Sequence, residues 1–153
     1  MLFRSDGTVR ELSSASGLVT VDKSSDLAWL SVHDIGKNAL LFFEFTASNG
    51  MVGRGHHAPV AYKLLPLVTP KISISSQRDD AGVMVTLKTN GLALHLSLET
   101  DEPGRFDAGG FDMLAGEMRV VRFIADETAN LDKVTTSLIV RDLHGATYGV
   151  HSK

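Results

Sequence analysis

The stretch that decides the fold is Gly104–Glu117, G-R-F-D-A-G-G-F-D-M-L-A-G-E. Two aromatic residues, Phe106 and Phe111, flank the pair Gly109-Gly110, and glycine adopts backbone angles that other residues avoid. We therefore expect a strand that is interrupted in its middle, with a bend or bulge at one of these glycines. Ala115-Gly116-Glu117 then predicts a turn into the strand that follows.

Apolar and polar residues alternate through most of the chain with the period of two that is typical of strands. The run Ala39–Ala47 is longer and rich in aromatic residues, which favours a strand over a helix. No stretch shows the period of an amphipathic helix, so the predicted fold class is all-β. The expected strands cover residues 18–22, 27–32, 39–47, 51–63, 71–75, 83–88, 92–98, 118–125 and 136–143.

Several short polar segments predict the turns between these strands. Asn49-Gly50 follows an apolar run directly, and Asn-Gly is the strongest short hairpin signal. Asn90-Gly91 predicts a second turn of the same kind. Residues 77–82 predict a third turn, and residues 126–130 predict a polar loop.

The segment Leu64–Pro70 contains Pro66 and Pro70, which disfavour both a helix and a central strand, so it is the expected linker. After it, residues 71–153 hold about seven short strands, the number expected of an immunoglobulin-like sandwich. The first 66 residues hold about five or six, too few for a closed sandwich of this kind. We expect two units, a partial immunoglobulin-like β-sandwich over 1–66 and a second one over 67–153.

The composition of the chain excludes several classes of partner and site. The chain has 153 residues, of which 43% are hydrophobic and 22% charged, as in folded soluble proteins. A net charge of −3 gives no reason to expect nucleic acid or an anionic membrane as a partner. The absence of cysteine excludes disulfides and thiolate zinc sites. No apolar run approaches a membrane span and no signal peptide is visible at the N-terminus, so a cytoplasmic protein is expected; a signal on a longer parent is the alternative.

No pattern of catalytic residues stands out. The acidic pairs at 79–80, 101–102 and 126–127 lie in turn-like segments, where solvated loop charge is the better interpretation. His56 and His57 would point to opposite faces of a strand and cannot chelate one ion, so no metal site is predicted. Residues 53–58 match G-x-G-x-x-A, but Pro59 and a strand-like segment follow instead of a helix, so no cofactor site is predicted.

Carbohydrate binding would use exposed aromatic residues. Trp29 alternates with apolar neighbours and is interpreted as a core residue. Tyr62 and Tyr148 are the other candidates. His95 lies on an apolar strand and either faces solvent or is hydrogen-bonded in the core, whereas His33 lies in a predicted turn.

Residues Phe106–Glu117 also resemble a family signature. In the last β-sandwich of β-mannosidases and related family 2 glycoside hydrolases, a segment reads F-S-D-N-x-F-D-L-L-P-G-E. Both Phe residues, the Asp, one Leu, the Gly and the Glu are in register here. The chain departs from the signature at Asp107-Ala108-Gly109, which replaces S-D-N, and at Ala115, which replaces Pro.

This resemblance implies that the chain is a pair of non-catalytic C-terminal accessory domains. The parent enzyme would hydrolyse terminal β-D-mannose residues on a catalytic barrel that this chain lacks. Arg105, Phe106 and Phe111 are the expected docking residues for that barrel, and surfaces exposed by truncation are expected to cause self-association. The alternative is a free-standing carbohydrate- or protein-binding sandwich, and an enzyme acting through this chain alone is a more distant third.

Overall fold

The computed structural model describes residues 2–4, 9–12, 14–17, 31, 35–79 and 82–149. The chain divides into two compact units, Met1–Pro66 and Leu67–Lys153. The strands expected at 18–22 and 27–32, together with Trp29 and His33, lie outside the described residues, except for Ser31.

The described part of the first unit is one antiparallel sheet with the strand order β2-β1-β3-β4. A single turn of 3-10 helix, η1, follows the sheet. The bounds of these elements are β1 Leu2–Arg4, β2 Val9–Arg10, β3 Ala39–Thr46, β4 Val52–His57 and η1 Tyr62–Leu64. The partial-sandwich assignment of this unit stays a prediction.

Strands β3 and β4 form the hairpin that Asn49-Gly50 predicts. Gly50 has a φ of 82° and its N–H donates to the carbonyl oxygen of Ala47 at 2.9 Å. The side chain of Asn49 accepts from the N–H of Met51 at 3.0 Å, which fixes the turn. The returning strand ends at His57, earlier than the predicted Lys63, because the chain enters η1 after Pro59.

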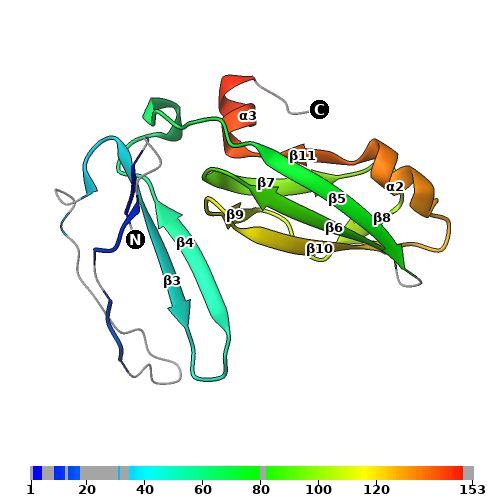
Figure 1. The fold of residues 1–153 in the computed structure, drawn as a ribbon, viewed down its shortest axis with the longest axis horizontal. Helices are drawn as coiled ribbons and strands as arrows, with labels where there is room; N and C mark the ends of the chain where they lie inside the picture. Colours follow the sequence, from blue (N-terminus) through cyan, green and yellow to red (C-terminus); the bar gives the residue numbers. More distant parts are fainter. Residues whose placement is uncertain are drawn as a thin grey trace. The chain divides into compact units, whose positions relative to one another are not determined.

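Within residues 67–79 and 82–149, the second unit holds seven strands and two short helices (Figure 1). The larger sheet has the order β5-β6-β10-β8 and the smaller sheet the order β11-β7-β9. All strand pairs are antiparallel. The bounds are β5 Ile72–Asp79, β6 Gly82–Thr89, β7 Ala93–Glu99, β8 Gly104–Phe106, β9 Phe111–Met113, β10 Met118–Ala125, α2 Leu131–Ser137, β11 Ile139–Arg141 and α3 Leu143–Tyr148.

The strand order identifies the sandwich as immunoglobulin-like. An immunoglobulin constant domain places strands A, B, E and D in one sheet. If β9 is set aside as an added strand, β5, β6, β10 and β8 are the first, second, fifth and fourth strands of the unit and reproduce that order. The all-β, immunoglobulin-like prediction is confirmed.

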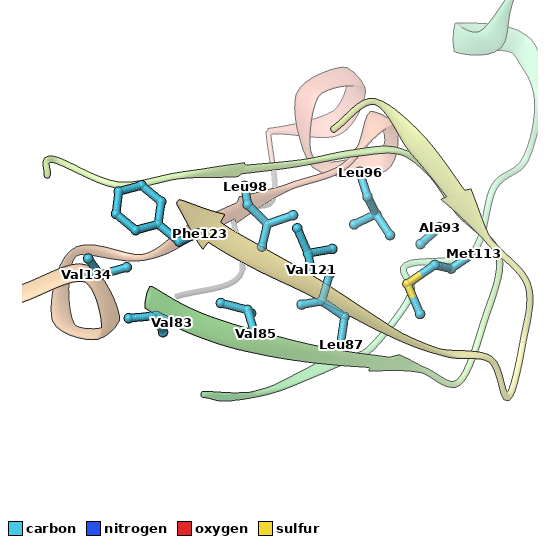
Figure 2. Close-up of a cluster of buried hydrophobic side chains, with 10 residues drawn as sticks. All are labelled: Val83, Val85, Leu87, Ala93, Leu96, Leu98, Met113, Val121, Phe123 and Val134. Atoms are coloured by element: carbon cyan, nitrogen blue, oxygen red, sulfur yellow. The ribbon is translucent and has the colours of Figure 1, made fainter. Parts of the chain in front are cut away.

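The core lies between the two sheets. Alternate residues of β6 and β10 point inward, β7 contributes Ala93, Leu96 and Leu98, and the side chain of Val134 enters from α2 (Figure 2). Phe123 and Val134 lie at one end of this cluster and Met113 at the other. The buried members are Val83, Val85, Leu87, Ala93, Leu96, Leu98, Met113, Val121, Phe123 and Val134.

The predicted turn at Asn90-Gly91 is present, and two other local expectations for this unit were wrong. Asn90-Gly91 does not close a hairpin, because β6 and β7 belong to different sheets and the turn carries the chain between them. The predicted turn at 77–82 is shorter, since β5 continues to Asp79 and β6 begins at Gly82. The predicted strand 136–143 is reduced to β11 and flanked by two helices, α2 and α3.

Candidate functional site

The interrupted strand of the signature stretch is a crossing between the two sheets. Its first half, β8, pairs with β10 in the larger sheet, and its second half, β9, pairs with β7 in the smaller one. Gly110 lies at the crossing with a φ of 67°, a conformation that favours glycine, and its N–H donates to Leu96 O at 2.8 Å. The predicted bend is therefore at Gly110 and not at Gly109.

The carboxylates of the signature stretch hold the backbone in place. Glu117 Oε2 accepts from the N–H of Leu114 at 2.9 Å and closes the turn before β10. Asp112 Oδ1 accepts from the N–H of His95 at 2.9 Å. Asp107 Oδ1 accepts from the N–H of Arg122 at 2.9 Å. Each of these carboxylates therefore has a structural partner.

His95 is strained at the point where Asp112 binds it. Its φ of 52° lies in the left-handed region, and it is the only non-glycine residue with positive φ among the described residues. The pairing of β7 with β9 shifts register between Ala93 and Leu96, so the strain marks a β-bulge. The side chain of His95 is exposed, which settles the alternative that its sequence left open.

A surface hollow of about 350 Å³ lies beside the crossing. It is formed by the end of β7, by β8 and by the segment before the crossing. Its lining residues are Ser97, Leu98, Glu99, Thr100, Glu102, Gly104, Arg105, Phe106, Ala108, Gly109 and Phe123.

Two of the three predicted docking residues line this hollow. Arg105 is exposed on β8, and its side chain makes no hydrogen bond or ion pair within the described part of the chain. Phe106 is half-buried, with its ring 5.1 Å from the ring of Phe123. Phe111 lies on β9 in the other sheet, where the guanidinium of Arg119 lies 4.0 Å from its ring centroid. Phe111 does not line the hollow.

Comparison with protein families decides the assignment. A family model described as an Ig-fold domain, Ig_mannosidase, matches residues 67–146. The chain belongs to this family. The match starts at the first residue of the second unit and ends within α3. Ig_mannosidase domains are found in β-mannosidase-type family 2 glycoside hydrolases and are themselves non-catalytic, so the suspected resemblance is confirmed. A comparison with curated proteins gives no match.

The acidic residues around the hollow of this Ig_mannosidase domain are engaged as well. Glu99 Oε2 accepts from Nε of Arg141 at 2.9 Å, and Glu102 Oε2 accepts from the N–H of Asn130 at 2.7 Å. Among the described residues, no three His, Asp or Glu side chains gather as a metal site. In the same part of the chain, no helix is long and apolar enough to cross a membrane.

The aromatic candidates for sugar stacking are mostly occupied. Tyr62 OH lies 2.6 Å from Nε2 of His56, and both side chains are half-buried. Tyr148 is 43% exposed, and its ring packs at 4.8 Å against His144. Residues 53–57 of the G-x-G-x-x-A match lie within β4, and only the single 3-10 turn η1 follows them, so the match does not open an α-helix and carries no phosphate site.

His144 is a buried polar residue that sequence reasoning missed. Its Nε2 lies 3.2 Å from Thr69 Oγ1, and its Nδ1 is buried without a hydrogen-bond partner. Asp142, two residues earlier, caps α3 through Oδ1 and leaves Oδ2 buried and unpaired. The one local signal in the sequence was Asp142, a residue type that is favoured at helix N-caps.

Proposed function

We propose that the chain is the non-catalytic C-terminal accessory part of a β-mannosidase-like glycoside hydrolase. The parent enzyme hydrolyses terminal β-D-mannose residues on a separate catalytic barrel, and this chain packs against that barrel. The observation that carries the proposal is the match of the Ig_mannosidase Ig-fold family over residues 67–146.

The chemistry of the described carboxylates supports a non-catalytic role. Retaining glycosidases need two carboxylates about 5 Å apart that face each other across the scissile bond. In this domain Asp107, Asp112 and Glu117 each accept a backbone N–H. These hydrogen bonds stabilise turns and the sheet crossing, which is a structural role for each of the three carboxylates.

The hollow beside β8 is the proposed docking surface for the barrel. Arg105 offers a guanidinium that no described side chain neutralises, and Phe106 offers a half-buried ring at the same place. Arginine and aromatic residues carry a large share of the binding energy in protein interfaces. A barrel segment that fills the hollow and presents a carboxylate to Arg105 would satisfy both.

A reconstitution experiment tests the proposal. The catalytic barrel encoded with this chain would be produced with and without residues 1–153, and its β-mannosidase activity would be followed during heating. We expect the chain to slow thermal inactivation of the barrel, and Arg105→Glu to weaken that protection. Lys88→Glu makes the same charge change on β6. Lys88 pairs with the first residue of β10, whereas β8 pairs with the last three, so this variant should leave protection unchanged. A barrel whose inactivation is indifferent to the chain contradicts the proposal.

A further inference from the structure

One edge strand of the second unit is much longer than the other edge strands that the structure describes there. Strand β5 forms the outer edge of the larger sheet and runs for eight residues. The other three edge strands of this unit, β8, β9 and β11, have three residues each. Proteins commonly shorten their edge strands or interrupt them with bulges, lysine or proline, because an open edge can pair with another strand.

Strand β5 carries none of these protective features between its ends. Its pairing with β6 is continuous from Ile72 to Asp79, without a bulge. The strand contains no proline or lysine, and its first charged residue is Arg78. Residues 73–78 are exposed, and Ile74 is 46% exposed although it is a large apolar residue.

The hydrogen bonds of β5 show which backbone groups face outward. In the β5–β6 register Asn90 lies directly opposite Lys71. The N–H of Asn90 donates to Lys71 O at 3.2 Å, so these two residues form a hydrogen-bonded pair. In an antiparallel pair, hydrogen-bonded and non-hydrogen-bonded residues alternate. The odd-numbered residues of β5 therefore bond to β6, and the N–H and C=O groups of Ile72, Ile74 and Ser76 point to the open edge.

We propose that β5 pairs antiparallel with β5 of a second copy of this chain. A two-fold axis at Ile74 places Ile74 opposite Ile74 of the partner subunit, and Ile72 opposite Ser76 of the partner subunit. These are the outward-facing residues, so the pairing forms about six hydrogen bonds and joins two four-stranded sheets. The exposed Ile74 side chains become a cross-strand apolar pair.

The charge pattern and the proline that ends the register favour a second copy of this chain over an unrelated strand. With the axis at Ile74, Lys71 lies opposite the uncharged Gln77 of the partner subunit, so no like charges oppose each other. The pairing ends where Arg78 meets Pro70 of the partner subunit, since proline has no N–H to donate. Helix α2 contacts the side chains of Ser76 and Arg78, and because its Val134 lies in the core, it does so from the inner face of the sheet.

Sedimentation velocity of the purified chain over a wide concentration range tests the pairing. We expect a monomer that converts to a dimer as concentration rises. Ile74→Lys places a charge on the edge and should weaken dimerisation at least about tenfold. Val120→Lys makes the same kind of change at an exposed site on β10, an inner strand, and should alter it by less than about twofold.

Amide hydrogen exchange by NMR locates the contact in the wild-type chain, so the result does not depend on how a variant folds. The amides of residues 72, 74 and 76 should exchange more slowly as concentration rises. Those of residues 73, 75 and 77, already bonded to β6, should not change. A monomer at every concentration, a dimer insensitive to Ile74→Lys, or protection without this alternation would overturn the proposal. None of these outcomes bears on the docking proposal, because that surface involves β8, at the other edge of the sheet.

Discussion

The guanidinium of Arg122 binds the carboxylate of Asp79 through two parallel hydrogen bonds of 2.8 Å each. Arg122 lies on β10 and Asp79 at the last residue of β5, so the pair spans the intervening strand β6. Two-point pairs of this geometry are stronger and more specific than single hydrogen bonds. This pair therefore ties the edge strand β5 to the inner part of its sheet.

We predict that Arg122→Ala lowers the midpoint of thermal unfolding more than Arg78→Ala does. Arg78 makes one hydrogen bond to Asp132, and the side chains of both residues are strongly exposed. Exposed single pairs contribute little to stability. Differential scanning calorimetry of the two variants checks the order, and equal shifts would show that the two-point geometry adds nothing.

The pH dependence of the Arg122 effect follows from its pKa. The hydrogen bonds that Arg122 donates to Asp79 raise the pKa of Arg122 above its ordinary value; burial opposes this, and the charges of Asp79 and Asp107 add to it. Because the pKa of Arg122 is higher in the folded protein than in the unfolded chain, its charge stabilises the fold fully at any pH below the unfolded-state pKa. This stabilisation is lost only as the pH rises through the folded-state pKa. The stability difference between wild type and Arg122→Ala, attributable to Arg122 ionisation, should thus be constant across neutral pH. The measurement is the destabilisation caused by Arg122→Ala in weakly acidic and in weakly alkaline buffer. If this destabilisation changes between the two buffers, and the change disappears when Arg122→Ala is made in an Asp79→Ala background, the expectation is contradicted.

The two glycines at the sheet crossing should respond differently to substitution. Gly110 has a φ of 67°, whereas Gly109 has no positive φ, and neither would place a Cβ near another atom. Gly110→Ala should therefore cost about 1–3 kcal/mol of unfolding free energy through backbone strain alone. Gly109→Ala is the control and should be close to neutral. Chemical denaturation measures both, and equal costs would mean that the crossing does not depend on the conformation of Gly110.

The strained residue His95 offers the opposite sign of effect. Because its φ of 52° suits glycine better than histidine, His95→Gly should stabilise the domain by about 1 kcal/mol. Ser97→Gly, two residues along the same strand at an ordinary φ, should destabilise it by about 0.5–1 kcal/mol. If urea unfolding shows that both substitutions destabilise, the side chain of His95 contributes more than its backbone costs.

The sequence was sufficient for the strands of the second unit because their signals are local. Alternation and turn residues placed β6, β7 and β10 within a residue or two of their observed bounds. Helix α2 was missed since it has seven residues and buries only Val134, so no helical period can be seen. Its one local signal was Asn130, whose side chain caps the helix by accepting from Asp132 N.

The assignment of strands to sheets depended on contacts that no local pattern contains. Asn90-Gly91 has the composition of a hairpin turn, yet Thr89 Oγ1 bonds to both the N–H and the carbonyl oxygen of Gly91 and turns the chain toward the other sheet. Similarly, Phe106 and Phe111 are five residues apart but belong to different sheets. Arg105 and Phe106 therefore share the hollow and Phe111 does not, and the docking role of all three stays a prediction.

We propose that this Ig_mannosidase chain serves a β-mannosidase without being catalytic itself. The direct measurement is hydrolysis of a chromogenic β-mannoside by two samples: the purified chain, and the material that an antibody against the chain precipitates from the cells that produce it. The account predicts that the precipitate hydrolyses the substrate and contains a family 2 catalytic barrel, whereas the purified chain gives only the uncatalysed rate. Heat-labile turnover by the purified chain, or a precipitate that contains the chain and no barrel, would contradict it.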